Sequence, residues 1–361
     1  MLIKQKNKLL LSAREFIFSL ILVFSISFLF IIRENIFYFI QEIIDRFTRN
    51  IILVLSLLLP SISGIGINFG IAIGIMIAQL IILYITSLEM CGIWGIVISF
   101  LLAVPISILT GYITGLILDR CKNREIIASM IIGFFVFGFY QLFLMYLCGD
   151  KKKFKYVISF KNKNMLLPRG YGLRNTIDLK IASVLDNFLA LRFFINKRTV
   201  KIPVLTLLVI FLFCLAIKIF QKTKLGQEIR ATGYDKIASI NAGINIKSTR
   251  IISIIISTLL ACCGQIIYLQ NIGVINTYNT TEQSIMFTAA SFLLSKTKRK
   301  EIRIRSIILA TLFFHTVFVI TPMITKIFIN NPIYDEYIRN FISYLIIFVS
   351  LFLAAQKKYN L

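Results

Sequence analysis

Side chains that could perform chemistry are few and scattered in this sequence. The chain has one histidine, His315, among its 361 residues. Its six cysteines lie in or beside apolar runs without metal-ligand spacing, so we predict no metal site, no disulfide framework and no cofactor. The Gly-x-x-x-x-Gly-Lys-Ser/Thr phosphate loop and the Gly-x-Ser-x-Gly and His-Glu-x-x-His motifs are all absent. The sequence therefore predicts no catalytic residue and no ATP hydrolysis by that route.

Five uncharged amide side chains lie in or directly beside the apolar runs. They are Asn68, Gln79, Gln141, Gln265 and Asn271. Hydrogen bonding between helices explains any one of them. As a group they favour a pathway for a neutral polar solute, because an amide can bind such a solute without the cost of burying a charge. The candidate pathway residues are Asn68, Gln79, Gln141 and Gln265.

The composition is that of a membrane protein. Hydrophobic residues make up 58% of the chain, and the mean hydropathy is +0.84. Apolar runs long enough to cross a bilayer recur along the sequence, which predicts an all-α, polytopic membrane protein with about 8–10 transmembrane helices in a single domain, residues 1–361. The net charge of +24 comes from basic residues between these runs, and it suits anionic lipid head groups better than nucleic acid.

The apolar runs predict where the spans lie. The expected spans are 16–32, 51–67, 69–85, 92–118, 126–148, 202–220, 251–270, 306–328 and 341–355. Residues 282–295 are too short for an ordinary span and predict a re-entrant or short helix. Surface helices are expected at 36–47 and 181–195. Four glycines between positions 64 and 74 favour close helix packing or, alternatively, a broken helix that exposes Asn68 to a central cavity.

The distribution of charge predicts the orientation. With both termini in the cytoplasm and 282–295 counted as a crossing, the basic segments 119–125, 221–249 and 296–305 fall inside. The short outer loops are mostly acidic. The loop 149–201 is basic, and we predict that it lies outside because long loops escape the charge rule.

Residues 225–246 form the one long polar segment that predicts an ordered helix between spans. Ala231, Ala238 and Ala242 suit a small-residue helix, and Gly233 and Gly243 bracket it with tight turns. Such a helix can seat in a groove of a soluble partner and move as a lever.

This segment resembles the cytoplasmic coupling segment of ABC-importer permeases, in the subgroup for branched-chain amino acids, ribose-type sugars and nucleosides. The matching positions are Gly226, Arg230, Ala231, Gly233, Ala238, Gly243, Ile244 and Asn245. The resemblance implies that these residues dock an ATPase, that a second, identical or related permease subunit completes the pathway, and that an extracytoplasmic solute-binding protein delivers the solute. It also implies a bacterial inner-membrane location.

The resemblance is weaker near the expected pathway. Asn68-Phe69-Gly70 is similar to the Asn-Ile-Gly of nucleoside-type members, but Ile73-Gly74 stands where a glutamate is expected. A sugar or nucleoside is the expected solute.

Two other functions stay open. The first is an ion-coupled secondary transporter of a neutral polar solute. Such carriers usually keep ionisable groups at mid-membrane, whereas Glu89, Asp119 and Glu125 all lie near the ends of spans. The second is a membrane scaffold or an intramembrane enzyme, and no catalytic constellation supports the enzyme.

Overall fold

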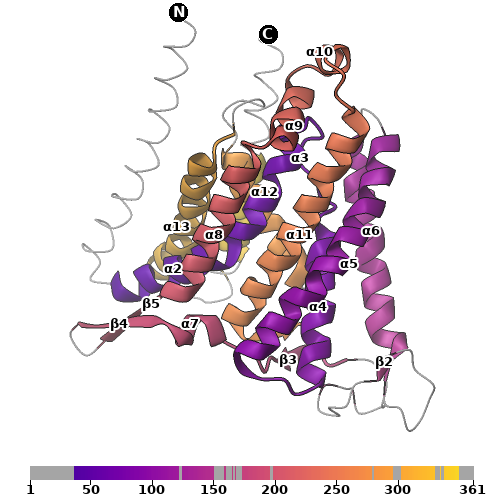
Figure 1. Ribbon diagram of the computed structural model, residues 1–361. Coiled ribbons are helices and arrows are strands. Elements are labelled where there is room, and N and C mark those ends of the chain that lie inside the picture. The colour runs from indigo at the N-terminus through magenta and orange to yellow at the C-terminus, as the bar shows by residue number, and fades with distance from the viewer. Residues whose placement is uncertain are drawn as a thin grey trace, which may run out of the picture. The chain divides into compact units, whose positions relative to one another are not determined.

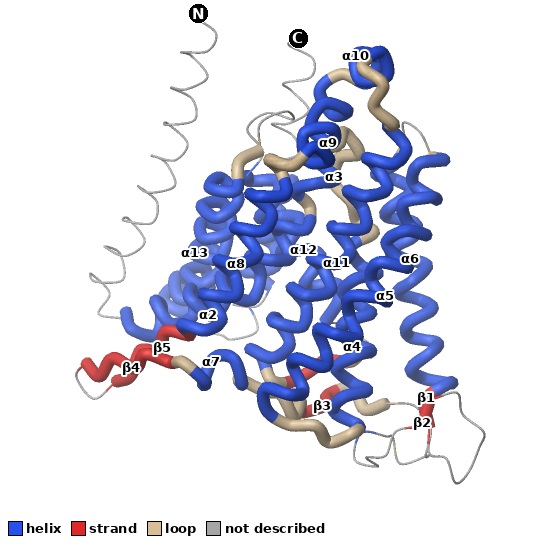
Figure 2. The backbone as a smooth tube through the Cα atoms, in the orientation of Figure 1, coloured by secondary structure: helices blue, strands red, loops and turns tan. Residues whose placement is uncertain are grey.

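The computed structural model confirms an all-α, polytopic membrane protein. It describes residues 36–121, 124–149, 158–159, 165, 167, 173–195, 198–278, 280–295, 302–329, 334 and 337–348. Helices dominate these residues, and the strands form only three two-stranded sheets (Figures 1 and 2). The expected span 16–32 lies outside the described residues, as does most of the basic segment 296–305.

The helices follow the apolar runs. They are α2 (Ile36–Ser56), α3 (Leu58–Ile62), α4 (Ile71–Ser87), α5 (Gly92–Arg120), α6 (Glu125–Leu142), α7 (Val184–Phe188), α8 (Val204–Phe220), α9 (Lys224–Tyr234), α10 (Lys236–Asn241), α11 (Ile246–Ile272), α12 (Thr280–Ser295) and α13 (Ile304–Ile329). A π-helical turn, Phe143–Leu147, continues α6, and residues Tyr337–Phe348 are helical.

The strands are short and lie between helices. They are β1 (Cys148–Gly149), β2 (Ile158–Ser159), β3 (Thr176–Asp178), β4 (Ala190–Ile195), β5 (Arg198–Pro203) and β6 (Val274–Asn276). β1 pairs with β2 in parallel, β3 pairs with β6 antiparallel, and β4 pairs with β5.

The chain divides into two compact units. Unit 1 contains residues 1–47, 191–202 and 287–361, and unit 2 contains residues 48–190 and 203–286. Helices α2 and α12 begin in one unit and end in the other. All the candidate site residues belong to unit 2.

Unit 2 is built around α11, which packs closely against α5 and α4 (Figure 1). A Cβ atom at Gly115 of α5 would lie 3.2 Å from the Cα atom of Ile251, and one at Gly111 would lie 2.9 Å from that of Ile255. As the residue number falls along α5 it rises along α11, so the two helices are antiparallel. A Cβ atom at Gly74 of α4 would lie 2.5 Å from the carbonyl oxygen of Thr258. Glycine therefore permits the close approach of both helices to α11.

The two ends of unit 2 carry different features. At one end, α9 lies beside α3, and α10 lies beside α9 (Figure 1). At the other end is the β3–β6 pair. Residues 181–182 also lie at this second end, because a Cβ atom at Gly95 would contact Ile181 and one at Gly273 would contact Ala182.

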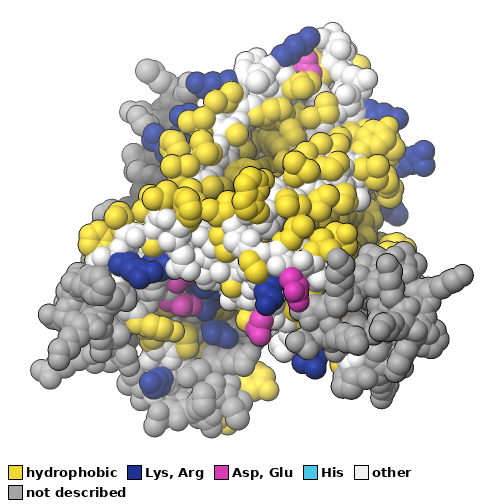
Figure 3. Space-filling view, turned by 60° about the horizontal axis from the view of Figure 1, so that its bottom comes forward, with side chains coloured by type: hydrophobic (Ala, Val, Ile, Leu, Met, Phe, Trp, Pro, Cys, Tyr) yellow, Lys and Arg dark blue, Asp and Glu magenta, His cyan; other side chains and the backbone are white. Residues whose placement is uncertain are grey.

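Several helices have the length and composition of membrane spans. Within the described residues, four qualify: Gly92–Arg120, Glu125–Tyr146, Ile246–Ile272 and Ile304–Lys326. Taken together, α8 and α9 also have the length and composition of a span, but the chain bends by 72° between them. Phe134, Phe135 and Phe139 of α6 and Leu101 and Leu109 of α5 are exposed. Hydrophobic side chains gather over much of the face seen in Figure 3, as expected of surface in contact with lipid.

Two expected surface helices differ from the structure. The residues expected to form a separate helix at 36–47 continue into the apolar run as α2. Their polar groups are satisfied along the helix, since Arg46 pairs with Glu42 at 2.6 Å and Gln41 donates to Asp45 at 3.0 Å. The helix expected at 181–195 is limited to the five residues of α7, because residues 190–195 pair as β4 with the following strand β5.

In unit 1, His315 is fully buried on α13. Its ring meets those of Phe314 and Phe287 edge to face, with centroids 5.2 and 6.2 Å away. These contacts place His315 in a packed interface between α12 and α13.

Candidate coupling surface

The polar segment after α8 folds into two short helices rather than one. Thr223 caps α9, its hydroxyl oxygen accepting a hydrogen bond from the Gly226 N–H at 3.3 Å. α9 runs through Gly233 and ends at Tyr234, and α10 starts two residues later at Lys236. The expectation that Gly233 forms a turn is therefore wrong, because this glycine is helical.

Asp235 joins the two helices. Its N–H donates to the carbonyl oxygen of Ala231 at 3.1 Å, which ends α9. Its carboxylate accepts from the N–H groups of Ile237 at 2.8 Å and Ala238 at 3.2 Å, which starts α10. One residue thus supplies hydrogen bonds at both adjoining helix ends and connects them.

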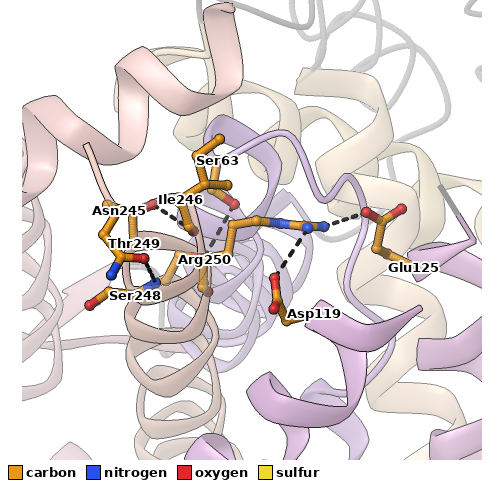
Figure 4. Close-up of polar contacts among 9 residues, drawn as sticks. Ser63, Asp119, Glu125, Asn245, Ile246, Ser248, Thr249 and Arg250 are labelled. Atoms are coloured by element: carbon orange, nitrogen blue, oxygen red, sulfur yellow. Dashed lines mark hydrogen bonds and ion pairs between the residues drawn. The ribbon is translucent and has the colours of Figure 1, made fainter. Parts of the chain in front are cut away.

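Gly243 provides the turn expected of it after α10. It has φ of +76°, and a Cβ atom there would meet no atom within 4 Å, so the backbone angle rather than crowding favours glycine. The N–H of Ile244 donates to the carbonyl oxygen of Ser239 at 3.0 Å. Asn245 then caps α11 by accepting from the Ser248 N–H at 3.2 Å (Figure 4).

Gly233 is required for packing. A Cβ atom at this position would overlap the carbonyl oxygen of Ile62 and would lie 2.9 Å from its carbonyl carbon and 3.2 Å from the nitrogen of Gly64. The backbone of α9 is therefore in direct contact with the end of α3. Gly226 is also crowded, because its Cβ atom would lie 2.7 Å from the Cα atom of Gln221 in the turn before α9.

The other predicted residues of the segment face outward or lie at its edge. Arg230 and Ala238 are exposed, whereas Ala231 and Ile244 are half-buried. The most exposed apolar side chains are Ile237 and Ile240 on α10, at 73% and 61%. No sequence motif indicated these two residues, although their three-residue spacing places them on one helix face. This apolar face suits binding to another protein.

The structure does not bring the candidate pathway residues into one cluster. Asn68, Gln79 and Gln265 are fully buried, and Gln141 is half-buried. The chain is broken between α3 and α4, as one alternative expected, but Asn68 is enclosed by protein in that break. Its Oδ1 atom accepts from the Gly70 N–H at 2.9 Å and so closes a turn directly before α4.

Gln79 and Gln265 lie at similar depth in unit 2. α4 and α11 are parallel, since they touch at Gly74 and Ala261 and both end near residues 181–182. Gln79 lies five residues after Gly74, and Gln265 lies four residues after Ala261. At 1.5 Å per residue, each is therefore about 6–8 Å beyond the point where the two helices touch. Gln79 accepts a hydrogen bond at 3.1 Å from Thr281, a partner that no sequence pattern indicated. Neither amide atom of Gln265 has a hydrogen-bond partner among the described residues.

Asn271, the fifth of the amides in or beside the apolar runs, has a different kind of partner. Asn271 donates to the carboxylate of Asp186 at 2.6 Å. Asp186 is buried and also accepts from Thr206 at 2.6 Å, which ties α7 to α8 and α11. Asn271 therefore has a structural role, and Asp186 gave no sequence signal because it lies in a segment without a recognisable motif.

Together, the helical fold and the polar helix pair at one end of unit 2 define a multi-pass membrane protein with an ordered polar surface segment. The family model described as "Branched-chain amino acid transport system / permease component" matches residues 39–351, and the chain belongs to this family of ABC-transporter permease components. No curated protein and no solved structure matches the chain. The expected family is confirmed, and its members act in transport.

Proposed function

We propose that this chain is the transmembrane permease subunit of an ATP-driven importer for a small polar solute, with a sugar or a nucleoside as the favoured class. An ATPase subunit docks on residues 226–244, a second permease subunit of the same or a related sequence completes the pathway, and an extracytoplasmic binding protein delivers the solute. The protein resides in a bacterial inner membrane with both termini in the cytoplasm.

The observation that carries the proposal is the geometry of α9 and α10. Both helices are capped, and α10 presents Ile237 and Ile240 to solvent. At the same time, Gly233 brings α9 into backbone contact with α3. A force that an ATPase applies to α10 therefore has a direct route to the break between α3 and α4, where Asn68 is buried. Binding on one surface can thus favour one access state of the pathway over the other.

The proposed solute class follows from the charges in the interior. Gln79 and Gln265 are buried in unit 2 and are neutral, and Thr281 adds a hydroxyl group. Groups of this kind suit hydroxyl and amide groups of a solute. An amino acid carries both an ammonium and a carboxylate group, which need charged or strongly hydrogen-bonding partners when they leave water.

The alternative is an ion-coupled transporter. We disfavour it because the buried Asp, Glu and Arg side chains in the described part of unit 2 lie near helix ends and have partners: Arg250 with Asp119 and Glu125, and Asp186 with Thr206 and Asn271. Uptake by the purified chain alone, driven by a proton or sodium gradient, would establish this alternative.

The test uses the purified permease–ATPase complex in liposomes with its binding protein. Radiolabelled ribose, uridine and leucine are supplied on the outer side, and uptake is measured with and without ATP. We expect ATP-dependent uptake of ribose or uridine. Uptake of leucine in their place would reject the solute class but retain the importer.

A surface variant tests the docking site. Ile237→Asp together with Ile240→Asp should abolish co-purification of the ATPase, because two charges replace the apolar face. Met90→Asp, also at an exposed apolar residue but in the turn between α4 and α5, is the matched control and should retain the ATPase. Equal retention in both variants would reject α10 as the docking site.

A further inference from the structure

A buried ion cluster lies directly after the proposed coupling segment. The Arg250 side chain, in the second turn of α11, is 4% exposed. Its guanidinium pairs with the carboxylate of Asp119 at 3.5 Å and with that of Glu125 at closer range (Figure 4). The three side chains come from three helices, since Asp119 is in the last turn of α5 and Glu125 is the first residue of α6. The cluster therefore joins α5, α6 and α11.

The Asp119 contact duplicates a connection that already exists. Gly111, Gly115 and Asp119 are spaced four residues apart and share one face of α5. The two glycines bring this face against the backbone of α11 at Ile255 and Ile251. α5 and α11 thus stay together through backbone packing, with or without the Asp119 carboxylate.

The Glu125 contact, by contrast, connects α11 to α6, the helix that borders the break between α3 and α4. Ser129 lies one turn after Glu125 on the same face of α6. Its hydroxyl oxygen accepts a hydrogen bond at 3.1 Å from the N–H of Phe69, next to Asn68. A Cβ atom at Gly66, also in the break, would lie 3.1 Å from the Ile126 side chain. The first turns of α6 therefore contact Arg250 and the break at the same time.

We propose that Arg250 and Glu125 are positioning residues of the transport cycle, which transmit the movement of the coupling segment through α6 and Ser129 to the break that holds Asn68. This inference rests on the proposed function. It adds a second route to the direct contact of Gly233 with α3, and it assigns Asp119 a subordinate role.

The cluster supplies its own matched control. Glu125→Gln and Asp119→Asn each remove one carboxylate and leave Arg250 paired with the other, so both variants keep the buried cation neutralised. They differ in the helix that is released from the ion pair, α6 in Glu125→Gln and α5 in Asp119→Asn. Ser129→Ala breaks the same route at its next contact without changing any charge.

The experiment measures solute taken up per ATP hydrolysed by the reconstituted complex, together with its melting temperature and its ATPase content. We expect Glu125→Gln and Ser129→Ala each to lower the uptake-to-ATP ratio about fivefold or more, while Asp119→Asn changes it less than about twofold. The double variant Glu125→Gln/Ser129→Ala should be no worse than either single variant, since both changes interrupt one route. Melting temperature and bound ATPase should not account for the loss.

Two results would overturn the inference. One is a ratio that falls equally in Glu125→Gln and Asp119→Asn, which would indicate a structural cluster only. The other is an unchanged ratio in Ser129→Ala. Absence of ATP-driven uptake in the unaltered complex would instead reject the proposed function itself, and the inference with it.

Discussion

Replacement of Gly233 by alanine tests the mechanical contact between the coupling segment and the pathway. The added methyl group would overlap the carbonyl oxygen of Ile62 and would lie 2.9 Å from its carbonyl carbon. Ordinary van der Waals contact begins at 3.4 Å, so the carbonyl carbon would have to move away by about 0.5 Å and the overlapping carbonyl oxygen by more than that. Both partners in this contact are main chain, and no side-chain rotation can relieve it.

The magnitude follows from the cost of overpacking. Strain of this kind costs about 1–3 kcal/mol. When it falls on only one access state, the population of that state drops by about 5- to 150-fold. We therefore expect Gly233→Ala to lower uptake per ATP by a factor in this range, with the protein still inserted in the membrane and the ATPase still bound. The assay is ATP-driven uptake into liposomes, with ATP hydrolysis measured in the same sample.

Gly138→Ala is the matched control. Gly138 is also helical, on α6, and a Cβ atom there would meet no atom within 4 Å. This substitution should leave the uptake-to-ATP ratio unchanged. A Gly233→Ala complex with the unaltered ratio and the unaltered melting temperature would refute the assignment of this contact as the transmitting one.

Three further predictions concern the coupling segment and its orientation. Asp235→Ala removes the cap of α10 at a cost of about 1 kcal/mol, so amide hydrogen exchange in α10 should accelerate about fivefold while that in α5 is unchanged; equal exchange would contradict the shared cap. Gly243→Val places a β-branched residue at φ of +76° and should destabilise the segment by about 1–2 kcal/mol, whereas Gly243→Asn should be tolerated; thermal unfolding of the two variants makes the comparison. A membrane-impermeant maleimide applied to intact cells should label Cys91 but not Ile237→Cys until the cells are permeabilised, and the reverse pattern would invert the proposed topology.

The sequence was most informative about features that repeat locally. Apolar runs of spanning length predicted the positions of α5, α8 and α11 closely, because helix formation in a bilayer depends on local hydrophobicity and internal hydrogen bonding. The family was also predictable, since the coupling segment keeps its characteristic residues within a gap-free stretch. Gly243 was interpreted correctly for the same reason, as a C-terminal turn is a local property.

Features that depend on distant partners were not predictable. Nothing near Gly233 in the sequence indicates that Ile62 lies against it, so a packing glycine was interpreted as a turn glycine. Arg250, directly after the basic segment 221–249, gave no sequence signal of its own, because its two carboxylate partners are more than a hundred positions away. The helix expected at 181–195 failed because strand pairing with the next segment outweighs a weak amphipathic pattern.

The cap at Asp235 has a mechanical consequence. The backbone N–H of Asp235 bonds the end of α9, and its side chain bonds the start of α10. These bonds restrict the angle between the two helices. The joint after α10 contains Gly243, which is exposed, and an added Cβ atom there would meet no atom within 4 Å, so side-chain packing confines this joint less. If α10 is the docking site, we expect a force on it to be transmitted mainly through Asp235 to α9 and α3, and only secondarily along the axis of α11.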